Sequence, residues 1–266
     1  MITIKEYNMV QNLEEAYELY QKRNNIIIGG MMWVKMQTKN INTAIDLSNL
    51  GLNKIVERDD KFIIGAMTPL RDLETSKALE KCFGDGIKES LRHIIGTQFR
   101  NCATVGGSIY MRFGFSDILT SLMALGAEVE LYKKGIIPLE EYAQMPKDRD
   151  ILVNIIINKK PVKMKYMSLR NSSTDFPVIS CAVSQDENGY RAYVGARPER
   201  CKCVKDEKNI LTGEITPEKV QEFAEYVKES LVFNTNRRAT AAYRKHITGV
   251  LVKRCIEAIN GGMWKC

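Results

Sequence analysis

Two pairs of adjacent glycines are the features of this sequence that most suggest binding chemistry. Gly29-Gly30 ends an apolar, β-branched run, and Gly106-Gly107 follows about 75 residues later, after Ala103-Thr104-Val105. Glycine permits positive φ and leaves backbone N–H groups open to an anion. Two such turns could hold a diphosphate between them, although two ordinary tight turns would give the same spacing. Neither pair fits G-x-G-x-x-G or G-x-x-x-x-G-K-[ST], so the residues do not support a Rossmann or P-loop site.

Side chains for acid–base, nucleophilic or metal chemistry are few. His93 and His246 are the only two histidines, and neither has the spacing of a triad or a metal site. We expect His93 to be a structural residue of a helix and His246 to lie on a helix surface. Cys201 and Cys203 lack the further cysteines that zinc or an iron–sulfur cluster requires, so we expect two free thiols in a loop. Many possible backbone cradles and few reactive side chains are typical of a protein that carries a cofactor.

Composition excludes several classes of protein. Of the 266 residues 27% are charged, the mean hydropathy is −0.24, and no apolar run approaches the ~18 residues of a membrane span. The first residues have no signal-peptide pattern. Seven cysteines without framework spacing favour a reducing compartment, and we therefore expect a cytoplasmic protein. The net charge of +7 is scattered, without the basic stripe of a nucleic-acid-binding surface, and suits a solvated surface or an acidic partner subunit.

The first two segments of the chain must position the glycines. Residues 1–56 predict a β-α-β-α-β order, with a helix from Leu13 and short strands at 26–28 and 44–47. A turn at 58–61 opens a second segment, 57–158. Its pattern predicts the following elements: a strand at 62–66, helices near 70–80 and 86–94, the second glycine turn, a helix that Ser116 opens, and strands at 127–133 and 151–157.

The third segment, 162–266, follows a polar junction at 158–161 that contains a proline. Strand-like runs at 163–169, 177–184 and 190–196 alternate with turn signals and predict an antiparallel sheet. Thr216 and Pro217 are typical of a helix start. A last helix at about 240–259 is predicted to bury one stripe of side chains: Ile247, Val250, Leu251, Cys255 and Ala258.

Five strings of the sequence resemble, in order, the FAD-binding medium subunits of molybdenum hydroxylases, a family that includes xanthine and carbon monoxide dehydrogenases. The first glycine pair resembles their AGGT/S loop, and Arg100–Ile109 resembles RN-x-A-T-I/V-G-G-N/S-I. The other strings and their counterparts are 64–73 (IGA-x-T-x-L-x-x-L), 116–127 (SDLLPALLALGA) and 243–252 (YRRHLAGVLV). Together the strings span residues from about 20 to about 258. Because five strings match in the same order along the chain, the resemblance is specific.

The resemblance implies an α+β chain: a two-lobed FAD-binding fold of the PCMH/vanillyl-alcohol-oxidase type, then a C-terminal domain of antiparallel sheet plus helices. The expected domains are lobe 1 at 1–56, lobe 2 at 57–158 and the C-terminal domain at 162–266. The expected flavin contacts, with no catalytic or metal-binding residue among them, are Ile27, Ile28, Gly29, Gly30, Met31, Met32, Trp33, Val34, Thr104, Gly106, Gly107, Ser108, Asp117, Leu152 and Lys165.

Each part of that set has an implied role. Ile27 to Val34 would surround the diphosphate and ribityl chain, and Thr104 to Ser108 would face them across the cofactor. Asp117 would bond sugar or ribityl hydroxyls, although an acid at a helix start is favoured by the helix dipole in any case. Leu152 would lie near the isoalloxazine. Lys165 would lie near its pyrimidine end, although a solvated lysine at a strand end would look the same.

The sequence departs from the family pattern in two places. Met31 and Met32 stand where a small polar residue usually follows the glycines, so backbone donors must bind there without a side-chain bond. Gly114-Phe115 stands where a proline often precedes the Ser-Asp motif, so the local loop can differ.

The resemblance also implies an assembly. A molybdopterin subunit would hydroxylate the substrate, a subunit with two [2Fe–2S] clusters would relay electrons, and this chain would pass them through FAD to NAD⁺ or another acceptor. The closest resemblance is to the flavin subunits of bacterial purine or xanthine dehydrogenases. Two alternatives stay open: a self-sufficient flavoenzyme of similar fold, and a flavin-free adaptor, which the altered first loop would suit.

Overall fold

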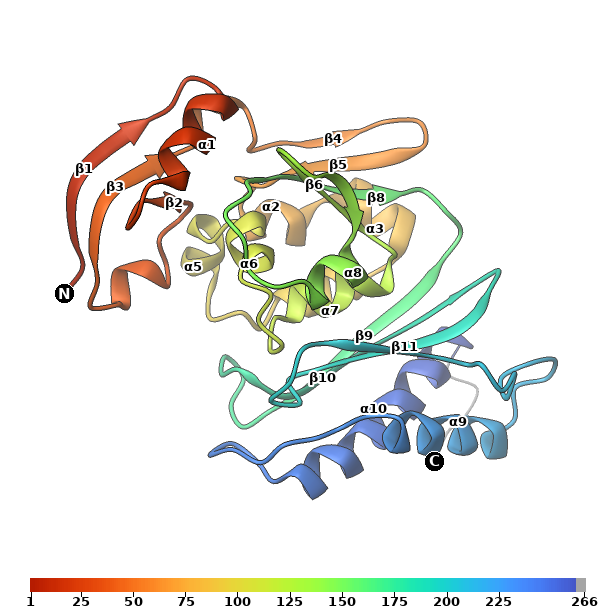
Figure 1. Cartoon of the computed structure of the whole chain (residues 1–266). Coiled ribbons are helices and arrows are strands. Elements are labelled where there is room, and N and C mark those ends of the chain that lie inside the picture. The colour runs from red at the N-terminus through yellow and green to blue at the C-terminus, as the bar shows by residue number, and fades with distance from the viewer. Residues whose placement is uncertain (262–266) are drawn as a thin grey trace.

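The computed structural model describes residues 1–261, which form three sheets with helices packed on them (Figure 1). The first sheet is parallel, in the order β1-β3-β2, and α1 covers it. Its elements are β1 (Thr3–Met9), α1 (Leu13–Gln21), β2 (Ile26–Ile28) and β3 (Asn40–Asp46), with short 3-10 turns at Val34–Met36 and Ser48–Leu50. The first glycine pair follows β2 directly.

The second sheet has five antiparallel strands in the order β4-β5-β8-β6-β7. The strands are β4 (Ile55–Glu57), β5 (Lys61–Gly65), β6 (Glu128–Leu131), β7 (Gly135–Pro138) and β8 (Leu152–Asn158). The boundary expected after residue 56 falls inside the β4–β5 hairpin. This sheet and the helices packed near it share a large apolar core that includes Phe62, Leu122 and Ile155.

Seven short helices accompany this second sheet. They are α2 (Leu70–Thr75), α3 (Lys77–Phe83), α4 (Gly86–Leu91), α5 (Thr97–Cys102), α6 (Val105–Tyr110), α7 (Asp117–Ala124) and α8 (Leu139–Gln144). The single helix expected near 70–80 is two helices, because the Ser76 side chain caps α3 at the Leu79 N–H and starts a new helix there. The predicted helix start at Ser116 is confirmed, since its hydroxyl accepts from the Leu119 N–H.

The third sheet is antiparallel, in the order β12-β11-β10-β9, as the sequence predicts for its first three strands. Its strands are β9 (Lys163–Arg170), β10 (Pro177–Asp186), β11 (Gly189–Gly195) and β12 (Lys202–Lys205). In Figure 1 α7 lies above this sheet, and α9 (Pro217–Glu229) and α10 (Ala241–Ile259) lie below it. Residues 177–184 of β10 are all buried because both faces of the sheet are covered.

Both C-terminal helices begin where the sequence predicts, but the buried stripe of α10 differs from the expected one. Thr216 and Thr240 cap α9 and α10 through their side chains. Leu251 and Cys255 are buried, whereas Ile247, Val250 and Ala258 are only half-buried. The stripe is rotated because Arg244 and Thr248 are buried too. The guanidinium of Arg244 donates to the carbonyls of Val178, Asn234 and Ala239, which satisfies its charge inside the core.

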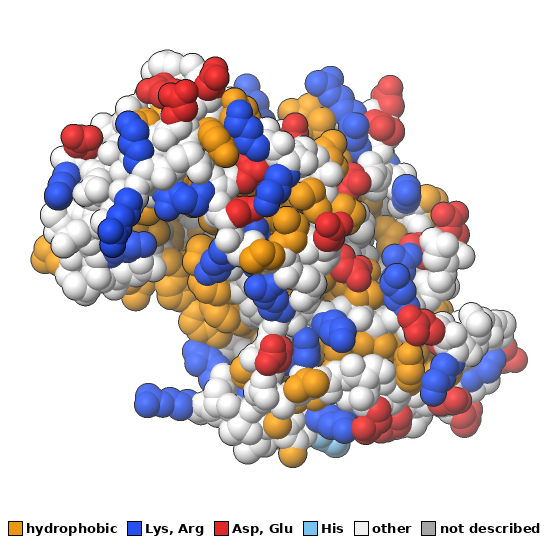
Figure 2. Space-filling model, viewed as in Figure 1, with side chains coloured by type: hydrophobic (Ala, Val, Ile, Leu, Met, Phe, Trp, Pro, Cys, Tyr) orange, Lys and Arg blue, Asp and Glu red, His pale blue; other side chains and the backbone are white. Residues whose placement is uncertain are grey.

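The surface agrees with the scattered charge of the sequence. On the face shown in Figure 2, basic and acidic side chains are interspersed and form no continuous basic stripe. Among the described residues, no helix is long and apolar enough to span a membrane.

Candidate functional site

The two glycine segments lie against each other in the fold. A Cβ atom built on Gly29 would lie 2.6 Å from the hydroxyl oxygen of Thr104, and one built on Gly30 would lie 1.7 Å from the carbonyl oxygen of Cys102. Real Cβ atoms essentially never approach other atoms closer than 3.0 Å. The first glycine pair is therefore required by close contact between the backbone after β2 and the backbone before α6.

The second glycine pair lies in a helix and not in the tight turn that the sequence suggested. Thr104 caps α6, and its hydroxyl accepts from the Gly107 N–H at 3.2 Å. The Gly106 N–H donates to the Ala66 carbonyl at 2.8 Å, and a Cβ atom on Gly106 would lie 2.7 Å from Ala66. Around Gly107 a Cβ atom would meet only the Thr104 hydroxyl, at 3.1 Å. Gly106 is thus a packing glycine, while Gly107 is nearly unobstructed.

Backbone donors are distributed unevenly between the two segments. In α6 the Val105 N–H donates to Thr68 and the Ser108 N–H to Thr104, so these donors are already paired. In the first loop, the N–H groups of Gly30, Met31, Met32 and Trp33 donate to no acceptor within residues 1–261. The first loop therefore offers the free donors that an anion needs.

Side chains of the first loop point into different surroundings. Ile28 is buried, and Met32 is partly buried against the large core, so both side chains serve packing. Met31 adopts φ +56°, a left-handed conformation that is uncommon outside glycine and that turns the chain sharply. Trp33 is 43% exposed, and its ring stacks on Phe176 at 5.3 Å.

Leu152 is joined to the glycine segments through the second sheet. The Ala66 N–H donates to the Val153 carbonyl at 2.9 Å, and the Ala66 carbonyl accepts from Gly106. Leu152 itself is 4% exposed and packs in the large core. Its backbone neighbourhood is thus fixed relative to α6, while its side chain is enclosed by other apolar groups.

Asp117 is buried at the start of α7 and already has partners. Its carboxylate accepts hydrogen bonds from the Tyr166 hydroxyl and from the Arg170 guanidinium. Burial raises the pKa of the Asp117 carboxyl, and Arg170 and Tyr166 lower it; the net pKa lies above the ordinary aspartate value. Any ligand that Asp117 binds must share its oxygens with these two side chains.

Lys165 lies on β9 of the third sheet. Its ammonium group forms an ion pair with Asp85, the residue before α4, at 2.7 Å. Since Tyr166 follows it, Lys165 lies close along the chain to the Asp117 cluster. The side-chain hydrogen bond of Lys165 is made to Asp85 and not to a residue of the glycine segments.

Comparison with known proteins identifies the family. The model of the FAD-binding domain in molybdopterin dehydrogenases matches residues 3–159, more than half of the chain. The chain belongs to this family. The model of the carbon monoxide dehydrogenase flavoprotein C-terminal domain matches residues 165–259.

Individual relatives cover almost the whole length. The chain is 25% identical to the nicotine 6-hydroxylase medium subunit of Paenarthrobacter nicotinovorans, over 94% of this chain and 95% of that one. It is 28% identical to the uncharacterized protein YgfM of Escherichia coli K12, over 94% of both. A solved carbon monoxide dehydrogenase from Hydrogenophaga pseudoflava has the same fold, with a TM-score of 0.87, 21% identity and 97% of each chain covered.

The residues of this chain fit the binding of FAD. Free N–H groups in the first loop lie next to the second segment, where Gly107 leaves the backbone of α6 open. A diphosphate is an anion that such donors bind well. These residues therefore suit the phosphate-bearing part of FAD, and the altered Met31 and Met32 do not remove the backbone donors.

One ion pair that supports this site has no sequence signal. Arg100, on α5, donates to both carboxylate oxygens of Glu74, on α2, at 2.7 and 3.2 Å, and both side chains are buried. Burial raises the pKa of the Glu74 carboxyl, but hydrogen bonds from Arg100 and Arg71 outweigh it, so the net pKa lies below the ordinary value. The pair holds α5 in place directly before Thr104. The two residues stand 26 positions apart on separate helices, which no local pattern connects.

The remaining reactive side chains form no site. His93 lies after the end of α4 and contacts the Ser173 hydroxyl at 3.5 Å, and His246 is exposed on α10. Cys201 and Cys203 are free thiols as predicted, but Cys203 lies on β12 and not in a loop. Within residues 1–261 no cluster of His, Cys, Asp or Glu could hold a metal ion. Cys266 lies outside the described residues.

Proposed function

We propose that this chain is the FAD-binding medium subunit of a multi-subunit molybdenum hydroxylase of the cytoplasm. Its partners are a molybdopterin subunit and a [2Fe–2S] subunit, from which it takes electrons for NAD⁺ or another acceptor. The observation that carries the proposal is the contact between two glycine segments beside a loop with free N–H groups. A relative over nearly the full length, the nicotine 6-hydroxylase medium subunit, supports the assembly.

The chain's own residues have the following roles in this proposal. The N–H groups from Gly29 to Val34 bind phosphate oxygens, and Thr104, Gly107 and Ser108 complete the cradle from α6. Asp117 bonds a hydroxyl of the flavin while Tyr166 and Arg170 hold its carboxylate in place. Bound FAD supplies the electron-transfer chemistry, accepting electrons singly and releasing them in pairs.

Two further side chains complete the set. The backbone around Leu152 limits the space beside the ring system. Lys165 would supply a positive charge to the flavin ring, which would stabilise negative charge there. Its ion pair with Asp85 must weaken or be shared for this role.

For the partner's substrate we propose a purine such as xanthine. The support is the resemblance of residues 243–252 to purine-dehydrogenase flavin subunits. Co-expression with the neighbouring genes, followed by an assay of the complex against xanthine and against nicotine, tests this part. Turnover of nicotine but not of xanthine would contradict it and leave the flavin role intact.

A flavin-free adaptor is the second candidate, because the N–H groups of Val105 to Ser108 are already paired inside the chain. The absorption spectrum of the purified chain decides between them. We expect a flavin spectrum with about one FAD per chain, either as isolated or after incubation with FAD. A folded chain that stays colourless after incubation is the result expected of the adaptor. A self-sufficient flavoenzyme would instead turn over a substrate without partner subunits.

A further inference from the structure

A cavity of about 610 Å³ lies apart from the residues expected to hold the flavin. Its walls come from the segment between α6 and α7, the loop after α8, the β9–β10 loop with the start of β10, the loop after β11, and α10 with the residues before it. None of the expected flavin contacts lines it. One of its lining residues, Phe176, contacts the flavin loop by stacking on Trp33.

Aromatic rings form the middle of this cavity. Phe113 and Phe115 stack at 4.9 Å with an interplanar angle of 12°, and Phe176 meets Phe115 edge-on at 4.8 Å. Phe115 lines the cavity and is 36% exposed, so part of its side chain remains available for a further contact. Such rings bind a further planar ring by offset stacking or edge contacts.

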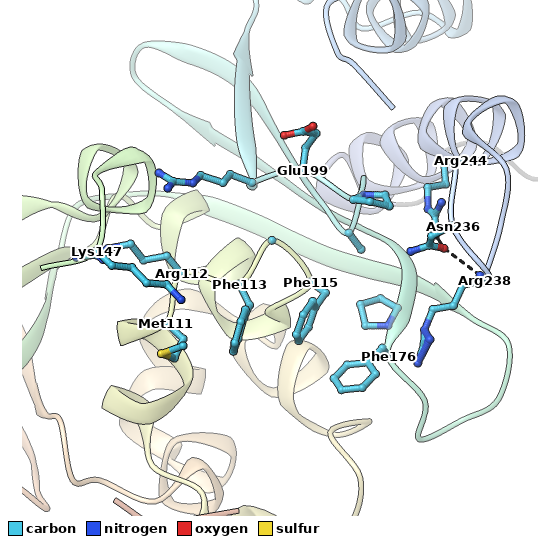
Figure 3. A pocket seen from close by; sticks show the side chains of 15 residues that line it. Met111, Arg112, Phe113, Phe115, Lys147, Phe176, Glu199, Asn236, Arg238 and Arg244 are labelled. Carbon is cyan, nitrogen blue, oxygen red and sulfur yellow. Dashed lines mark hydrogen bonds between the residues drawn. The ribbon is translucent and has the colours of Figure 1, made fainter. Parts of the chain in front are cut away.

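Positive charge gathers at one end of the rings. Figure 3 shows Arg112 and Lys147 beside Phe113, at the opposite end from Arg238. Lys147 is exposed, and within the described residues it forms no ion pair. Glu199 is the one acidic residue among the lining residues, against five basic ones.

Arg112 is the decisive residue, because its charge is buried without adequate partners. Its side chain is 2% exposed, and none of its three guanidinium nitrogens has a hydrogen bond. It stacks over Tyr142 at 3.9 Å and lies 3.8 Å from the nearest Asp148 oxygen, too far for a hydrogen bond. A buried donor without an acceptor is destabilising, and a buried charged donor more so. The backbone of Arg112 is also left-handed, at φ +52°.

The other basic residues of the cavity are already occupied. Arg200 donates to carbonyls of the loop after α8, Arg244 donates to carbonyls around Asn234, and Arg238 pairs with Asp175. Arg112 and Lys147 are the basic side chains of the cavity that donate to no acceptor within residues 1–261.

We propose that this cavity is a second ligand site, for a planar aromatic molecule that carries a carboxylate or phosphate group. The ring stacks among Phe113, Phe115 and Phe176. The anionic group lies at the Arg112–Lys147 end and gives the buried guanidinium its missing acceptor. The proposal does not depend on the identity of the partner subunits or of the electron acceptor.

Calorimetric titration of the FAD-loaded chain tests the site with four probes. Nicotinate has a ring and a carboxylate, and nicotinamide mononucleotide has a ring and a phosphate. Nicotinamide lacks the charge, and acetate lacks the ring. We expect at least one of the two anionic aromatic probes to bind, and to bind at least tenfold more tightly than nicotinamide or acetate. The phosphate and carboxylate arms show which anion the site prefers.

Variants locate the binding. Lys147→Met should weaken the preferred probe about fivefold, as expected for one partly exposed charge, whereas Lys202→Met, on exposed β12, should change nothing. Glu199→Gln should strengthen binding, because it removes the cavity's acid and keeps the acceptor for Asn234. Phe115→Leu should weaken binding by removing the exposed ring.

Several results would overturn the proposal. They are no binding of either anionic aromatic probe, equal binding of nicotinamide or acetate, or no effect of Lys147→Met and Phe115→Leu. Binding that occurs only in FAD-free chain would assign the cavity to the flavin itself. FAD content is measured separately by absorption, so failure here is distinguishable from failure of the flavin assignment.

Discussion

Substitution of individual glycines separates the packing role of the two segments from their binding role. Gly30→Ala places a methyl group 1.7 Å from the Cys102 carbonyl oxygen, so the loops must part by about 1.3 Å to reach the 3.0 Å limit. Because the obstacle is backbone and not the end of a flexible side chain, we expect overpacking to cost about 1–3 kcal/mol. For a chain of this size that lowers the melting temperature by roughly 2–10 °C.

Gly107→Val should lower the affinity for FAD and leave the stability of the fold nearly unchanged. A Cβ atom there meets only the Thr104 hydroxyl at 3.1 Å, and the position is helical, so the fold should lose less than about 1 kcal/mol. Its branched side chain nevertheless covers backbone that we expect to face the diphosphate. Obstruction of one charge-assisted hydrogen bond to the diphosphate from the free N–H groups of the first loop costs about 1.5–3 kcal/mol and should weaken FAD binding roughly tenfold to a hundredfold.

Thermal unfolding by circular dichroism and FAD binding by fluorescence quenching measure the two effects. Gly96→Ala is the matched control, because a Cβ atom on Gly96 meets only the Gln98 side chain at 3.7 Å. The control should match the parent in both assays. The reasoning is refuted if Gly30→Ala melts like the parent, or if folded Gly107→Val binds FAD with the parent's affinity.

Three further predictions follow from the same structure. The flavin should be non-covalent, since neither His93 nor the exposed Cys102 lies in an attachment pattern, so acid precipitation should leave all colour in the supernatant. The FAD-loaded chain should pass electrons from NADH to a dye but should not hydroxylate xanthine; hydroxylation by the pure chain would contradict the subunit role. Glu74→Gln should cost about 3–5 kcal/mol at pH 7, because it leaves the buried positive charge of Arg100 without a carboxylate partner. The pKa of the Glu74 carboxyl is lower in the folded than in the unfolded protein. The stability that Glu74 contributes is therefore present above its unfolded pKa and is lost as the pH falls through its folded pKa. Urea unfolding of both proteins at pH 7 and near pH 3.5 should therefore show the difference shrinking in acid, and a constant difference would argue against the ion pair.

Local signals in the sequence predicted much of the fold. Ser116, Thr216 and Thr240 are polar caps followed by helix-forming residues, and each starts a helix in the structure. The turn residues that end at Gly189 likewise predict the β10–β11 hairpin, because glycine readily adopts the positive φ of +92° found there. Such features depend on a few neighbouring residues and are therefore visible without tertiary information.

Features that depend on distant contacts could not be predicted. The second glycine pair is helical because Thr104 caps α6, and Gly106 is required by its close contact with Ala66, which follows β5 some 40 residues earlier in the chain. The buried stripe of α10 was misplaced because Arg244 is polar by type and becomes a core residue only through carbonyls of other segments. The sequence indicated which residues could form the flavin site, but it could not indicate which N–H groups remain free.

The most direct test of the central claim is titration of flavin-stripped chain with FAD, with a folded far-ultraviolet spectrum recorded first. We expect saturation at about one FAD per chain, with binding weakened in Gly107→Val and unchanged in Gly96→Ala. A folded parent chain that binds no FAD, or whose binding is the same in all three proteins, would contradict the assignment of the glycine segments as the flavin site.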